Sequence, residues 1–140
     1  MLSMYPAYVY KEKEGGYSVI FPDLDHLATC GDTLENALAM AQDCLAGHIY
    51  YCNKMGEKIN KPSDIADLVN PDDEYDDYEQ VFANLITVDV EEYAKIHFEK
   101  AVKKTLTIPK WLNDMAISNN INFSKTLQQA IIQELDHTQN

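Results

Sequence analysis

The sequence has no long hydrophobic run, few glycines and prolines, and only three cysteines. No apolar stretch approaches the roughly 18 residues that a membrane-spanning helix needs, so we expect no membrane partner. The N-terminus has no basic segment followed by an apolar core, which predicts that there is no signal peptide. Cys30, Cys44 and Cys52 are odd in number and lack CxxC spacing, so we expect free thiols in a cytoplasmic protein.

The composition is that of a globular protein whose charge is unevenly distributed. With 140 residues, of which 46% are hydrophobic, the chain is long enough for one domain or two small ones. The net charge is −12, but residues 1–94 carry −14 from five lysines and nineteen acids, whereas the rest carry +2 from six lysines and four acids. The first part should therefore repel nucleic acid and suit a basic protein partner.

The C-terminal third of the chain begins with the pattern of a strand. Polar and apolar residues alternate over 103–108, and Pro109 is expected to end the strand because it cannot donate to a ladder. The alternation places Leu106 and Ile108 on one face of the strand. The opposite face carries Lys103, Thr105 and Thr107.

Two helices are expected after this strand. The first has its apolar residues at helical spacing and ends at Asn119-Asn120, and the second is expected to begin at Ser124 as its N-cap. One strand and two short helices cannot bury a core alone, so we expect two copies to pair their strands antiparallel and share a core. The predicted dimer core consists of Leu106, Ile108, Trp111, Leu112, Leu127 and Ile131.

The outer face of the paired strands would carry basic and hydroxyl side chains, and such a ribbon fits the major groove of DNA. Base contacts are expected from the strand, and a phosphate contact from the N-terminus of the second helix. The predicted DNA-binding residues are Lys103, Lys104, Thr105, Thr107, Ser124 and Lys125. With its segments K-K-T-L-T-I-P, W-L-x-x-x-A and N-F-S-K, this stretch resembles the ribbon-helix-helix family of bacterial DNA-binding proteins. The alternative is a β-α-α piece packed into an ordinary core.

The order of expected strands and helices in the first part of the chain predicts an α+β layer. Strands are expected at 7–10, 17–21, 28–31 and 85–90. Asp32 is expected to cap a long helix that runs to about Asn53, because Glu35 follows three residues later as in a capping box. A short helix is expected to begin at Glu91. Segment 72–79, with six acids in eight residues, is expected to be a solvated loop.

Four segments in this part resemble HicB-type antitoxins in order and spacing: Y-P-A-Y-V-Y, G-G-Y-S-V-I-F-P-D-L, C-G-D-T-L-E-N-A-L-A-M-A and L-I-T-V-D-V. With the ribbon-helix-helix tail, the resemblance covers nearly the whole chain apart from the acidic insertion. It implies a truncated, inactive ribonuclease H-like domain of β-β-β-α-β-α order at 1–94. It also implies a ribbon-helix-helix (β-α-α) DNA-binding and dimerisation domain at 101–138.

The resemblance further implies a function. The first domain would bind and block a HicA-type toxin, a small basic ribonuclease that cuts mRNA. The tail would bind operator DNA and repress the shared operon. The protein would be a homodimer, or a tetramer if the first domains also pair. Tyr17, Asp23 and Asp25, polar groups at the predicted hairpin and the following loop, are the expected toxin contacts.

Two other functions stay open at this point. A nuclease would need several carboxylates converging on metal ions about 4 Å apart, and the first strand offers none, so we expect no catalytic residue and no cofactor. Cys44, His48 and Cys52 recur every four residues, a spacing that could offer metal ligands. Leu45 and Ile49 flank them, which favours an apolar helix face and no metal. A ribbon-helix-helix repressor that senses a small molecule or metal through its N-terminal domain is the remaining alternative.

Overall fold

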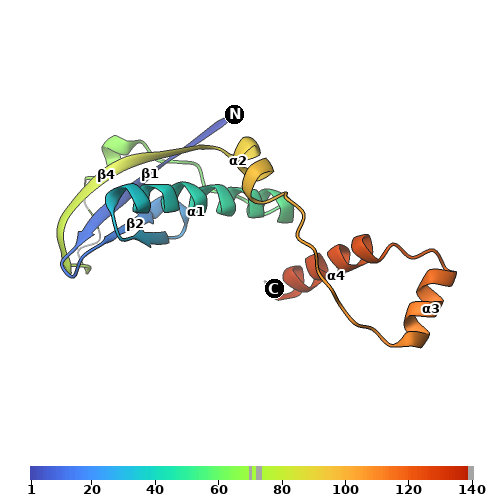
Figure 1. The fold of residues 1–140 in the computed structure, drawn as a ribbon. Helices are drawn as coiled ribbons and strands as arrows, with labels where there is room; N and C mark the ends of the chain where they lie inside the picture. Colours follow the sequence, from blue (N-terminus) through green and yellow to red (C-terminus); the bar gives the residue numbers. More distant parts are fainter. Residues whose placement is uncertain (70, 72–73, 139–140) are drawn as a thin grey trace. The chain divides into compact units, whose positions relative to one another are not determined.

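The computed structural model describes residues 1–69, 71 and 74–138, and the chain divides into two compact units. Unit 1 spans Met1–Lys100 and unit 2 spans Ala101–Asn140. Unit 1 contains a sheet and two α-helices, and unit 2 contains two further helices, α3 (Lys110–Ser118) and α4 (Phe123–Thr138) (Figure 1). The expectation of an α+β protein is therefore confirmed.

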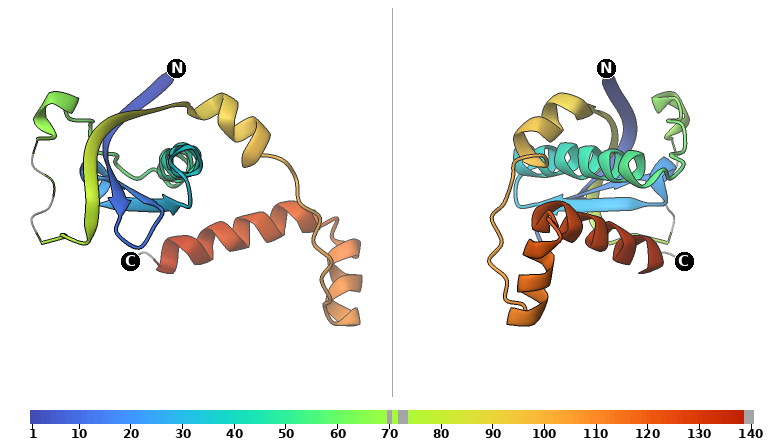
Figure 2. Two further views of the ribbon diagram at one scale, coloured as in Figure 1. Left: turned by 60° about the vertical axis from the view of Figure 1, so that its left-hand side comes forward. Right: turned by 90° about the vertical axis from the view of Figure 1, so that its right-hand side faces the viewer.

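The sheet of unit 1 has four antiparallel strands in the order β3-β2-β1-β4. The strands are β1 (Leu2–Glu12), β2 (Tyr17–Phe21), β3 (Leu27–Gly31) and β4 (Tyr78–Asp89). A short 3-10 helix, η1 (Pro22–Leu24), links β2 to β3, and another, η2 (Ile65–Asp67), lies in the connection to β4. Helix α1 (Leu34–Met55) covers one face of the sheet (Figure 2).

The core of unit 1 lies between that face and α1. Alternate residues of β1 and β2, among them Val9, Val19 and Phe21, are fully buried there because strand side chains point to opposite faces in turn. Leu45 and Ala41 meet them from α1, on whose inner face small and large apolar residues recur at helical spacing. The face opposite α1 carries the residues that alternate with these, such as Tyr8 and Ile20.

Strands β1 and β4 are both longer than the sequence predicted. They pair along almost their whole length, from Leu2 opposite Asp89 to Glu12 opposite Tyr78. Pro6 is tolerated inside β1 because the pairing with β2 begins only at Tyr8, so that at Pro6 the strand has a neighbour on one side alone. The strand predicted at 17–21 has the observed bounds of β2.

The N-cap of α1 is Thr33 and not Asp32, which corrects the sequence-based prediction. The side chain of Thr33 accepts a hydrogen bond from the backbone N–H of Asn36 at 3.1 Å. The helix therefore starts one residue later than expected. Gly31 lies against its first turn, where a Cβ would lie 2.5 Å from the Ala37 nitrogen. Gly56, at φ 69°, ends the helix in the left-handed conformation that favours glycine.

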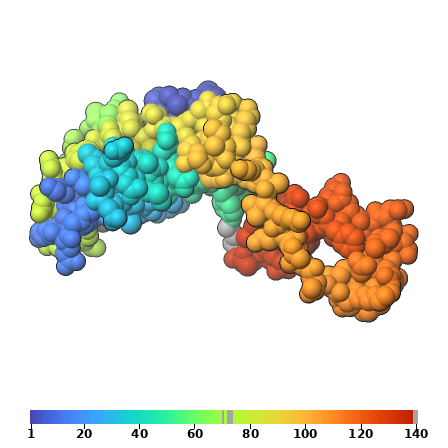
Figure 3. Space-filling view, viewed as in Figure 1, coloured from blue at the N-terminus to red at the C-terminus, as the bar shows by residue number. Residues whose placement is uncertain are grey.

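Helix α2 (Val90–His97) follows β4 directly and packs beside α1 (Figure 3). The Tyr93 hydroxyl donates a hydrogen bond to Asp43 on α1 at 2.8 Å. Burial, together with this bond, raises the pKa of Tyr93 to about 12.

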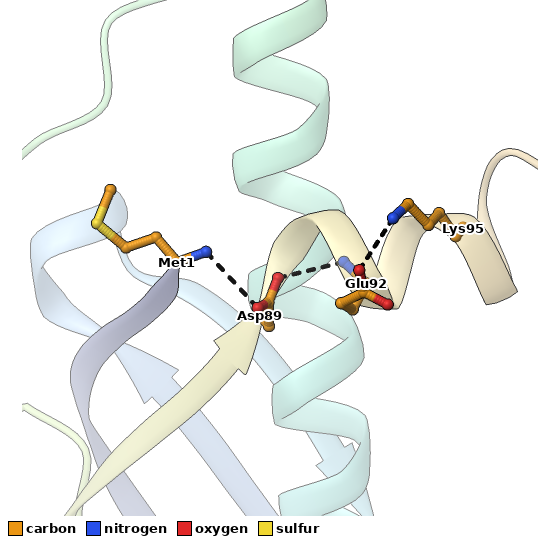
Figure 4. A network of polar contacts seen from close by, with 4 residues as sticks. All are labelled: Met1, Asp89, Glu92 and Lys95. Carbon is orange, nitrogen blue, oxygen red and sulfur yellow. Dashed lines mark hydrogen bonds and ion pairs between the residues drawn. The ribbon is translucent and has the colours of Figure 1, made fainter.

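A small polar network caps the start of α2 (Figure 4). The Asp89 carboxylate accepts a hydrogen bond from the Glu92 N–H at 3.2 Å and lies 3.6 Å from the amino group of Met1. Lys95 and Glu92 form an ion pair at 2.9 Å one turn further along. The N–H donated by Glu92 is the main reason why the pKa of Asp89 is lowered.

Unit 2 contains α3, a turn at Asn119-Asn120 and α4. Residues 101–109 form no strand in this single chain, so the predicted pairing at 103–108 requires a second chain and stays a prediction. In the described part of the chain, no helix has the length and apolar character needed to cross a membrane.

Candidate interaction surfaces

Most of the large apolar side chains of unit 2 are exposed. No residue of α3 or of the described α4 is buried, and Leu106 and Trp111 are 64% and 65% exposed. Ile131, on α4, is 50% exposed. A segment of this size with its apolar residues uncovered is not expected to be stable alone, so a further surface must cover it.

Part of this exposed surface is hollowed. A pocket of about 410 Å³ within unit 2 is lined by Leu106, Ile108 and Leu127, three residues of the predicted dimer core. Phe123 lines it as well, although the sequence analysis did not select it. Its place in the N-F-S-K segment, as the first residue of α4, was the available signal. Trp111, Leu112 and Ile131 lie outside this hollow.

The predicted DNA-binding residues lie on exposed parts of unit 2. Lys103, Lys104, Thr105 and Thr107 are exposed in the segment before α3, and Ser124 and Lys125 are exposed in the first turn of α4. The cap of α4 is Asn122 and not Ser124, because the Asn122 side chain accepts a hydrogen bond from the Lys125 N–H at 3.0 Å. That N–H is therefore already occupied, and the phosphate contact predicted there stays a prediction.

In unit 1, the three expected toxin contacts have different surroundings. Tyr17 is half-buried against the core, and Asp25 is exposed with φ at 54°. The carboxylate of Asp23 accepts hydrogen bonds from the N–H and the hydroxyl of Ser63, at 2.8 and 2.6 Å. The Asn60 side chain also donates to the Asp23 carbonyl at 3.0 Å. Asp23 therefore holds the segment after α1 against the sheet.

The same segment closes a pocket of about 490 Å³ over the sheet face opposite α1. Tyr8 of β1 and Ile20 of β2 are direct cross-strand neighbours and line the floor of the pocket. Asp67, Leu68 and Tyr75 belong to the later segment and form its walls. Because these residues are distant in sequence, no local pattern could have identified the pocket.

The acidic segment 72–79 is only partly a loop. Residues 72 and 73 lie outside the described residues, and Tyr78 and Glu79 belong to β4.

The hydroxyl of Tyr75 donates a hydrogen bond to Glu12, which raises the pKa of Tyr75 to about 12. Tyr75 and Tyr78 both pack edge-on against Tyr10, so the two tyrosines tie this segment to the sheet while Asp76 and Asp77 stay exposed.

The spacing of Cys44, His48 and Cys52 does not bring three ligands together. The Cys52 sulfur lies 3.7 Å from His48 Nε2, whereas the Cys44 thiol faces the carbonyl of Ala28. Burial raises the pKa of both thiols, which disfavours the thiolate that a metal needs. Among the residues described, no group of three His, Cys, Asp or Glu side chains is arranged to hold a metal ion.

The fold and these surfaces define an α+β protein with an acidic sheet unit followed by a separate two-helix unit. Unit 1 holds seven lysines against twenty acids, and unit 2 holds four lysines against three acids. Residues 5–131 match the model of the HicB_like antitoxin family of bacterial toxin-antitoxin systems, so the chain belongs to that family. The family inferred from the sequence motifs is thereby confirmed.

Relatives and solved structures agree with this assignment. The chain is 41% identical over 61 residues to Antitoxin HicB 1 of Photorhabdus laumondii subsp. laumondii, and 53% identical over 54 residues to Antitoxin HicB 2 of the same organism. These alignments cover 44% and 39% of this chain, and 39% of the length of each relative. In the solved toxin-antitoxin complex from Streptococcus pneumoniae, one chain is 32% identical with a TM-score of 0.63, over 96% of this chain and 99% of that chain.

Proposed function

We propose that this protein is an antitoxin that binds and neutralises a HicA-type mRNA-cutting toxin and represses its own operon by binding operator DNA. The observation that carries the first part is the similarity, over nearly the whole length of both chains, to a chain of a toxin-antitoxin complex. The strongly acidic surface of unit 1 supports the assignment, because an RNA-cutting partner tends to be basic and charge complementarity speeds encounter.

The architecture proposed for this function has two domains. Residues 1–94 would be a truncated ribonuclease H-like domain that binds the toxin, and residues 101–138 a ribbon-helix-helix domain that binds DNA as a dimer. The exposed apolar surface of unit 2 supports the second assignment, since a second copy would cover it. Neutralisation requires no catalytic residue and no cofactor in this chain. Its place of action would be the cytoplasm.

The test of toxin neutralisation is growth rescue. The full chain, expressed beside the HicA-type toxin encoded next to its gene, should restore growth and should co-purify with the toxin. Absence of both effects, with the antitoxin present at normal level, would reject the proposed function.

The test of repression is a double substitution in the predicted ribbon. Replacing Thr105 and Thr107 by alanine should weaken operator binding by about 1–3 kcal/mol for each lost base contact. The same variant should still rescue growth, because both residues lie in unit 2. Thr138→Ala, at the far end of α4, is the matched control and should bind operator DNA like the wild type. Unchanged binding by a folded double variant would contradict the ribbon assignment.

A further inference from the structure

The pocket on the sheet face opposite α1 has a chemistry of its own. Its lining combines the aromatic rings of Tyr8, Tyr10 and Tyr75 with the carboxylates of Asp23 and Asp67. Among the described residues that line it, His26 is the one basic side chain, and there is no lysine. Aromatic faces and carboxylates together favour a cation, through ring electrostatics and charge-assisted hydrogen bonds.

The two carboxylates of the pocket differ in what they already bind. Asp23 is held in place by its two hydrogen bonds from Ser63. The Asp67 carboxylate makes no hydrogen bond or ion pair within the described part of the chain; only its backbone N–H is bonded, to Asp64. Asp67 therefore has free acceptor capacity for a donor group that enters the pocket.

A second hollow adjoins this pocket. Ile20 and Tyr75 line both, and the second hollow, of about 410 Å³, continues along β2 and β3 to Ala28 and Cys30. An acidic pocket beside a more apolar strip has the pattern of an interface in which a charged side chain is anchored next to apolar contacts.

We propose that this surface is where unit 1 holds its protein partner, with a lysine or arginine side chain of the partner inserted between Tyr8 and Asp67. This inference rests on the proposed function, which makes the partner the toxin. The chemistry of the lining and the net charge of unit 1 argue against other occupants: phosphate groups of nucleic acid would be repelled, and a second copy of unit 1 would present acids to acids.

The first test compares two substitutions that each remove one negative charge. Asp67→Asn should weaken the Kd for the toxin about tenfold, since a tenfold change corresponds to about 1.4 kcal/mol for a lost charged contact. Glu35→Gln removes an exposed acid on α1, on the other side of the sheet, and should change the Kd by less than about twofold. The measurement is calorimetry of full-length antitoxin with a catalytically inactive variant of the toxin.

The outcomes separate the two proposals. If the wild-type chain does not bind the toxin, the proposed function fails. If the wild type binds and Asp67→Asn binds equally well, the pocket inference is overturned while the function stands. Because the Asp67 side chain has no described partner, its substitution should leave thermal unfolding unchanged.

A second test needs no substitution. Cys30 is exposed at the edge of this surface, whereas Cys44 is half-buried and Cys52 is buried. In the free protein N-ethylmaleimide should modify Cys30 first, and in the complex with the toxin Cys30 should be protected, as peptide mass spectrometry would show. Unchanged modification of Cys30 in the saturated complex would place the toxin on another face and overturn the inference.

Discussion

The two units of this protein differ in how far their apolar side chains are buried. In unit 1 the sheet and α1 bury Val9, Phe21 and Leu45 completely, so its core is complete within one chain. In unit 2 no residue of either described helix is buried, and most of their large apolar residues are exposed. Since covering apolar surface contributes about 25 cal/mol per Å², unit 1 gains its stability internally, and unit 2 would gain most of that contribution only when another surface covers it, which we propose to be a second copy.

The largest effect is expected from the core of unit 1. Phe21→Ala should lower the free energy of unfolding by about 3–5 kcal/mol, because it removes a fully buried ring and leaves a cavity. Leu85→Ala, at an exposed position of β4, should change it by less than about 0.5 kcal/mol. Urea denaturation measures both. Equal effects of the two substitutions would contradict the assignment of Phe21 as buried and Leu85 as exposed.

The next effect tests whether the exposed surface of unit 2 is covered by a second copy. Ile108→Lys would place a charge in the shared core, at a cost of several kcal/mol, and should abolish dimerisation and operator binding together. The matched variant Ile96→Lys changes an equally apolar, exposed residue of α2 in unit 1 and should leave both unchanged. Sedimentation of the full chain at micromolar concentration measures whether the dimer forms. A dimer that survives Ile108→Lys would contradict the predicted core.

A smaller effect is expected from the cap of α4. Asn122→Ala removes the acceptor for the Lys125 N–H and should cost about 1 kcal/mol of helix stability. Ser124→Ala should cost little stability, because Ser124 lies inside the helix. Thermal unfolding of the two variants distinguishes the caps. A larger loss for Ser124→Ala would restore the cap predicted from the sequence.

The smallest effect concerns Asp89 at the surface of unit 1. Its pKa is lowered in the folded chain, so its contribution to stability is present above the ordinary value of 3.8 and is lost as the pH falls through the lower folded value. A carboxyl titration followed by NMR should show a midpoint below 3.8 for Asp89. A midpoint at or above that value would mean that the cap of α2 does not form in solution.

Local sequence patterns predicted a good part of this fold. The strand predicted at 17–21 has the observed bounds of β2, and the apolar spacing after Gly31 predicts α1 to within a few residues. The caps were less predictable. Asp32 and Thr33 are both good capping residues, and the structure shows that the Thr33 side chain makes the capping hydrogen bond.

The sequence by itself determined the family, the order of strands and helices in unit 1, and the split between an acidic and a more basic part. These features depend on composition and on residues close together in the chain, so they can be read without coordinates. Only the tertiary structure decided how far β1 and β4 pair, that Asp23 binds Ser63, and that Tyr8 and Asp67 share one pocket. Each of these joins residues far apart in sequence, and burial and hydrogen bonding between them arise only once the chain has folded.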